Sequence, residues 1–133
     1  MGDFIVYVLS MVLITSNKQR RLLCMNYVQR VSPEELAGAW NELKAVLDDL
    51  PPGIQVLADL SQLEYMDPAC ENDMGRAMDL MDQHGVGLIV RVIPDPSKDI
   101  GLNILTLFHY PRPPRVITCE SLAQALKQLA LWS

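Results

Sequence analysis

The sequence predicts an α/β domain in which a mixed β-sheet is flanked by about four α-helices. The chain has 133 residues, of which 50% are hydrophobic and 20% are charged, as in one ordinary globular domain. Two apolar, β-rich segments at the start are separated by turn residues, which indicates an antiparallel hairpin. Helical and strand-like patterns alternate after it, so each crossover should return its strand parallel. We therefore expect a single domain over residues 1–133.

The first half of the chain carries the hairpin and one helix. "FIVYVLSMVLI" (residues 4–14) and "LLCMNYVQRV" (22–31) are the expected strands, with "TSNKQRR" as the turn. A helix should follow in "SPEELAGAWNELKAVLDDLPPG", because Ser32 suits an N-cap, Pro33 the first helical position and Glu35 a capping box. Its inner stripe recurs at helical spacing and consists of Leu36, Trp40, Leu43 and Leu47.

The second half alternates strands and helices. Residues 54–60 form an apolar run that suggests a strand buried on both faces. A helix is expected from Pro68 to about His84, closed by Gly85 in a left-handed conformation. "VGLIVRVI" and "RVIT" are further strands, and residues 97–110 and 121–132 are further helices. The inner face of the helix from Pro68 to about His84 should consist of Met74, Met78 and Met81. That of the helix over 97–110 should consist of Ile100, Ile104, Leu107 and Phe108.

Charge and cysteine usage narrow the class of protein. The formal net charge is −5, and Lys and Arg form no run beyond residues 18–21, which disfavours nucleic acid as a partner. Cys24, Cys70 and Cys119 show no metal-ligand spacing and fit a reducing, cytoplasmic compartment. The N-terminal apolar run is shorter than the ~20 residues that cross a bilayer, so no membrane association is expected.

The acidic residues between the central strand and the second helix are the first candidates for chemistry. Asp59, Glu64 and Asp67 are candidates for an acid–base enzyme, in which two carboxylates with separated pKa values divide the roles of acid and base. Asp67 before Pro68 is more typical of a helix N-cap, however, and Asp59 at a strand end suits a bond to loop amides better than a metal site. No second side chain able to bind a metal stands at a suitable spacing from Asp59 in the sequence, so we expect no metal. We expect no cofactor either.

Cys70 is the candidate nucleophile, because the first turn of a helix lowers the pKa of a thiol. Asp67, Glu71 and Asp73 oppose this effect by surrounding the thiol with negative charge. His84 and His109 stand at expected helix ends, and no nucleophile is tied to either by sequence. The sequence therefore predicts a protein that is not an enzyme.

The strand ending in "DLS", followed by "MD" before a helix, resembles the STAS domain of anti-sigma-factor antagonists. The resemblance implies a mixed sheet with flanking helices and a loop of sequence Asp-Ser-Ser-Gly, in which a partner kinase phosphorylates a serine. Met66 and Asp67 match the start of that loop, but Ala69 stands at a serine position. That switch therefore cannot operate here, and "VRVIPDPSKDIGLNIL" also departs from the family pattern, which indicates a divergent member.

These observations lead to two hypotheses. The first is a bacterial, cytoplasmic regulatory domain that binds a protein resembling an anti-sigma factor or its kinase, acts in transcription regulation and forms a homodimer through its hairpin edge. Its expected partner-binding residues are Asp67, Pro68, Ala69, Cys70, Glu71, Asp73, Met74 and Asp95. The alternative is a carrier or sensor of a small, lipid-like apolar ligand, held in a pocket lined by the methionine stripe and Phe108.

Overall fold

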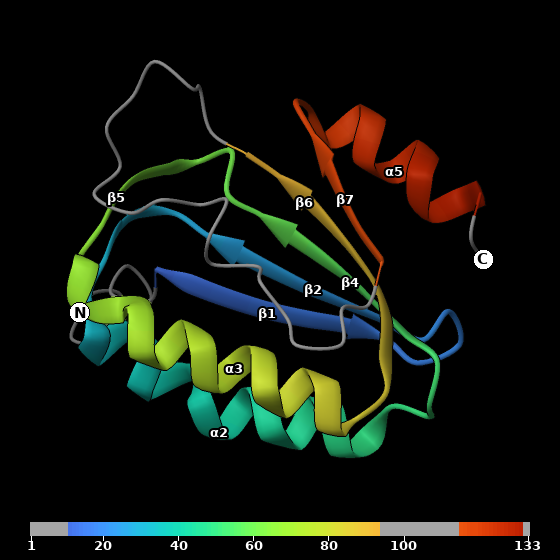
Figure 1. The fold of residues 1–133 in the computed structure, drawn as a ribbon, viewed down its shortest axis with the longest axis horizontal. Coiled ribbons are helices and arrows are strands. Elements are labelled where there is room, and N and C mark those ends of the chain that lie inside the picture. Colours follow the sequence, from blue (N-terminus) through green and yellow to red (C-terminus); the bar gives the residue numbers. More distant parts are fainter. Residues whose placement is uncertain (1–10, 94–114, 132–133) are drawn as a thin grey trace, which may run out of the picture.

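In the part of the chain that the structure describes, the main β-sheet has five strands in the order β1-β2-β4-β6-β7 (Figure 1). The computed structural model of the chain describes residues 11–93 and 115–131. β1 and β2 are antiparallel, and all other neighbours in this sheet are parallel, which confirms the predicted mixed sheet. The strands are β1 (Val12–Asn17), β2 (Leu22–Tyr27), β4 (Ile54–Asp59), β6 (Val86–Val92) and β7 (Arg115–Cys119).

The N-terminal hairpin forms as predicted, but its strands have different limits. β1 pairs with β2 from Val12 opposite Tyr27 to Asn17 opposite Leu22. β1 thus continues through residues expected in the turn, and Arg21, with a φ of 52°, completes a shorter turn. Residues 4–10 of the expected first strand lie outside the described residues.

The prediction that the second strand continues to Val31 was wrong. β2 ends at Tyr27, and Gln29 takes a φ of 56°, which redirects the chain. β3 (Gln29–Val31) then pairs in parallel with β5 (Leu63–Met66) as a separate two-stranded sheet. β5 lies where the sequence suggested only a loop, so the segment before Asp67 is held by strand pairing.

Helix α2 (Pro33–Asp49) begins where its sequence signals place it. The Ser32 hydroxyl accepts a hydrogen bond from the Glu35 amide at 3.4 Å, which confirms the N-cap. The Glu35 carboxylate accepts a hydrogen bond from the Met11 amide at 3.3 Å. This bond ties the start of α2 to the chain entering β1.

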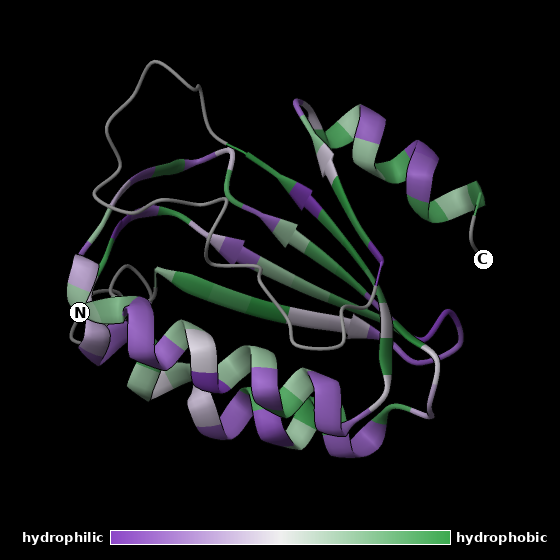
Figure 2. Cartoon of the chain, in the orientation of Figure 1, coloured by the Kyte–Doolittle hydropathy of each residue, from purple (hydrophilic) through white to green (hydrophobic). Residues whose placement is uncertain are grey.

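Helices cover both faces of the sheet (Figure 1). α2 and α3 (Glu71–Gln83) pack on one face, and α5 (Leu122–Leu131) packs against β6 and β7 on the other. Val56 faces the α2 and α3 side and Leu57 the α5 side, so β4 is buried on both faces, as predicted. Hydrophobic residues accordingly dominate the central strands, whereas the helices carry polar residues on their outer surfaces (Figure 2).

Residues 11–93 and 115–131 hold three α-helices, and the remaining expected helix, over 97–110, lies outside them. Met78 and Met81 are buried beneath α3, and Gly85 has a φ of 79°, both as expected. Among the described helices, none combines the length and apolarity needed to cross a membrane.

Candidate partner-binding site

The entrance to α3 is fixed by backbone hydrogen bonds around Asp67. The Asp67 amide donates to the Val31 carbonyl at 3.0 Å, which extends the β3–β5 pairing by one bond. The Asp67 carboxylate accepts from the Ala69 amide at 2.9 Å, and its carbonyl accepts from the Cys70 amide at 2.8 Å. Asp67 is therefore an N-cap, as predicted, but it caps a 3-10 turn, η1 (Pro68–Cys70), from which α3 continues.

The expected partner-binding residues divide into exposed and buried groups. Pro68, Ala69 and Glu71 are exposed, and Asp67 and Asp73 are partly exposed. Cys70 and Met74, in contrast, expose only 0% and 3% of their surface, so in this structure neither forms part of the outer face. Met74 starts the same inner stripe as Met78 and Met81, which explains its orientation. Asp95 lies outside the described residues.

Negative charge gathers around the entrance. Burial, and then the charges of Asp67, Asp73 and Glu34, raise the pKa of the Cys70 thiol to about 11. Glu34 was not foreseen as a neighbour, because it belongs to the first turn of α2 and only the packing of α2 beside η1 brings it here. We call Glu34, Asp67, Glu71 and Asp73 the acidic rim.

The buried thiol is poorly suited to nucleophilic chemistry. Cys70 Sγ donates to the Val31 carbonyl at 3.7 Å and lies beneath the rim. A thiol with a pKa of about 11 is overwhelmingly protonated at neutral pH, and the thiolate is the reactive form. The arrangement therefore holds Cys70 as a small core residue. Cys119 is also buried and Cys24 partly so, in line with the same role.

Two of the other titratable candidates, Asp59 and His84, have structural partners. Asp59 is buried, and its carboxylate accepts hydrogen bonds from the Ser61 amide at 2.9 Å and the Ser61 hydroxyl at 2.6 Å. Within residues 11–93 and 115–131, no three His, Cys, Asp or Glu side chains are grouped so that they could hold a metal ion. His84 stands at the end of α3, where its Nε2 lies 2.8 Å from Asp48 Oδ1. His109 lies outside the described residues.

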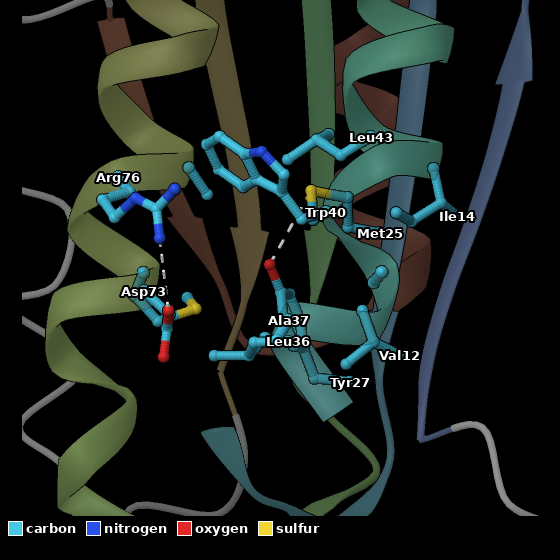
Figure 3. A pocket seen from close by; sticks show the side chains of 13 residues that line it. Val12, Ile14, Met25, Tyr27, Leu36, Ala37, Trp40, Leu43, Asp73 and Arg76 are labelled. Carbon is cyan, nitrogen blue, oxygen red and sulfur yellow. Dashed lines mark hydrogen bonds and ion pairs between the residues drawn. The ribbon is translucent and has the colours of Figure 1, made fainter. Parts of the chain in front are cut away.

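A pocket of about 140 Å³, which we call the α2–α3 pocket, opens between α2, α3 and the N-terminal hairpin (Figure 3). Trp40 and Leu43 come from α2, Met25 from β2 and Arg76 from α3. The Arg76 guanidinium lies 4.6 Å from the centroid of the Trp40 ring. The sequence indicated an apolar stripe on each helix. It could not predict the pocket, because a pocket depends on the distance between the two helices, which the sequence pattern of neither helix gives.

The described methionine stripe does not form this pocket as the ligand hypothesis expected. Met74 lines it together with Met25, whereas Met78 and Met81 pack elsewhere in the core. Phe108, the other residue expected in such a pocket, lies outside the described residues. The structure thus places a pocket near the predicted stripe but builds it mainly from α2 and the hairpin.

Comparison with known proteins supports the fold. No family model matches the sequence, and no curated protein matches it. A protein of the DUF3478 family with a SpoIIAA-like fold from Shewanella loihica PV-4 superposes with a TM-score of 0.60 at 17% identity, over 89% of this chain and 91% of that one. The anti-sigma factor antagonist SpoIIAA in its unphosphorylated form gives a TM-score of 0.59 at 11% identity, over 90% and 97%. The chain therefore has the SpoIIAA-like fold, that of a STAS-like domain.

Proposed function

We propose that this chain is a regulatory interaction domain that binds a protein partner through the acidic rim and the exposed residues Pro68 and Ala69. The observation that carries the proposal is the entrance itself, which a cap and a strand pairing hold in place while its charged side chains are exposed or partly exposed. Similarity in fold to an anti-sigma factor antagonist supports a partner of the anti-sigma factor or kinase class. Recognition there involves no covalent step and no enzymatic activity of this chain.

Charge determines which partner surface would fit. The rim carries four carboxylates, so a basic partner surface would gain both association rate and orientation from it. Pro68 restricts the backbone at the start of η1, which limits the entropy lost when a partner binds. We place this interaction in the cytoplasm of a bacterial cell, in the control of transcription.

Ala69 makes the proposed interaction independent of phosphorylation at this position. Its side chain is exposed and has no hydroxyl, so no phosphate can be added where the resemblance places a phosphorylated serine. Binding would then be regulated by the amount or state of the partner.

Pull-down from the native host with a charge-reversed rim tests the proposal. Glu71→Lys is the preferred variant, because Glu71 is exposed and does not line the α2–α3 pocket, whereas Asp73 does. Asp82→Lys is the matched control, since Asp82 is an exposed carboxylate in the last turn of the same helix. We expect Glu71→Lys to lose a defined protein that the wild type and Asp82→Lys retain. Equal recovery of that protein with both variants would rule out the acidic rim as its binding site.

We also propose that two copies associate through the edge of the hairpin. Among the strands that the structure describes, β1 forms one edge of the five-stranded sheet, and Leu13 on it is 47% exposed. An apolar strand edge readily pairs with another strand. Light scattering after size exclusion should give twice the mass of one chain, and Leu13→Lys should halve it. A wild-type protein with the mass of a single chain would remove the dimer from the account.

The α2–α3 pocket favours a second candidate function, that of a carrier or sensor of a small apolar molecule. Native mass spectrometry of freshly purified protein tests it, because a retained ligand appears as added mass. If the protein shows only the mass of the chain itself under gentle ionisation conditions, that result would count against a carrier function.

A further inference from the structure

We propose that the α2–α3 pocket binds one neutral, benzene-sized apolar molecule or group. The inference rests on the second candidate function and gives it a site, a size and a ligand class. It is independent of the acidic rim as a binding surface for a partner protein.

Both helices contribute small side chains to the pocket where they lie over the hairpin. Ala39 on α2 and Ala77 on α3 both line it. Between them the pocket reaches down to side chains of the sheet, among them Met25 and Tyr27, which are 3% and 2% exposed. A ligand that enters between the helices would therefore contact the sheet and exchange water for a largely apolar lining.

Volume sets the size of the ligand. The pocket holds about 140 Å³, and an engineered apolar protein cavity of about 150 Å³ is known to bind benzene. One six-membered ring or a short branched alkyl group therefore fits. Ligand pockets for drug-sized molecules usually span about 300–1,000 Å³, so a fused two-ring molecule or a long acyl chain would not be enclosed.

The lining of the pocket favours a neutral ligand. Two charged side chains line it, and they offset each other, because Asp73 Oδ1 and Arg76 Nη1 lie 4.0 Å apart (Figure 3). A charged ligand would therefore lose its hydration against a largely apolar lining without gaining an unpaired counter-charge, and burying an unpaired charge is costly. Arg76 also stacks over Trp40, which fixes one apolar wall.

Trp40 provides the signal for a direct test. The chain has two tryptophans, so Trp132→Phe leaves Trp40 as the sole indole. We would titrate this protein with benzene, benzoate and naphthalene and follow the Trp40 indole N–H by two-dimensional NMR. Benzene should shift that signal in a saturable way, whereas benzoate and naphthalene should not. Absence of a saturable shift with benzene would overturn the proposal.

Contacts between benzene and the protein locate the site without any variant. Nuclear Overhauser effects should join benzene protons to the methyl groups of Met25 and Ala77, which line the pocket. Effects confined to methyl groups outside the pocket would show binding elsewhere and would overturn the assignment.

Filling the pocket should abolish binding. Ala77→Leu places a larger side chain in it from α3, and Ala39→Leu does so from α2 in case the first variant does not fold. Ala45→Leu is the matched control, because Ala45 is exposed on α2 and does not line the pocket. We expect loss of the benzene shift in a folded pocket variant and an unchanged shift in the control. A folded Ala77→Leu protein that binds benzene as the wild type does would refute the site.

These measurements separate the site from the second candidate function. If native mass spectrometry shows a retained apolar ligand while benzene gives no saturable shift, the carrier function stands and the assigned site is wrong. If benzene binds in the pocket but no ligand is retained, the site stands and the carrier function fails.

Discussion

Asp67→Ala is the substitution that most clearly tests whether the entrance to α3 is held by its cap. The Asp67 carboxylate accepts from the Ala69 amide at 2.9 Å, and alanine cannot replace this acceptor. An N-cap lost to alanine typically costs about 0.5–2 kcal/mol. Ala69 is exposed, so water can take over the released amide, and we expect a loss of about 1 kcal/mol in the free energy of unfolding.

The expected loss is measurable by urea denaturation. With a slope of about 1–3 kcal/mol per molar urea, a loss of about 1 kcal/mol lowers the midpoint by roughly 0.3–1 M. The slope itself should not change, because the substitution exposes little new surface in either state.

Asp67→Asn separates the cap from the charge. Asparagine keeps a side-chain oxygen for the Ala69 amide and caps helices about as well as aspartate, so its unfolding midpoint should stay close to that of the wild type. It also removes a negative charge near Glu34 and Asp73, which should lower the pKa of Cys70. An Asp67→Ala protein as stable as the wild type, or an Asp67→Asn protein as destabilised as Asp67→Ala, would refute the capping account.

Two further predictions concern titrating groups. In a variant whose only cysteine is Cys70, thiol labelling at neutral pH should be at least about 100-fold slower than after unfolding, because its pKa rises from 9.0 to about 11; comparable rates would contradict the burial of this thiol. The Asp48 carboxylate and then the Leu80 carbonyl raise the pKa of His84, so its protonated ring stabilises the folded state. That contribution should be complete below the unfolded pKa near 6.5 and disappear as pH rises through the higher folded pKa. Urea midpoints from pH 5 to 8 should show this loss in the wild type but not in His84→Gln, and it should be small because the Asp48 side chain is 69% exposed.

Features encoded in a few adjacent residues were predictable from the sequence. Ser32 and Asp67 cap their helices because each side chain bonds an amide two or three residues away. The parallel order of β2, β4 and β6 followed from the alternation of strands and helices. Met78 and Met81 are buried because helical spacing places them on one face.

Features that depend on distant contacts were missed. β5 has only four residues, and it is a strand because β3 lies beside it after the chain turns at Gln29. Glu34 joins the acidic rim only through the packing of α2 beside η1. Met74 was expected both in the inner stripe and on the partner surface, and its burial shows that the helical periodicity was the better guide.

Amide hydrogen exchange on the complex with the recovered partner tests the central claim most directly. Backbone amides from Asp67 to Asp73 should exchange more slowly when the partner is bound, and those in the last turn of α3 should not change. Protection confined to α5 or to the hairpin, with the entrance to α3 exchanging as in the free protein, would show that the acidic rim is not where this domain recognises its partner.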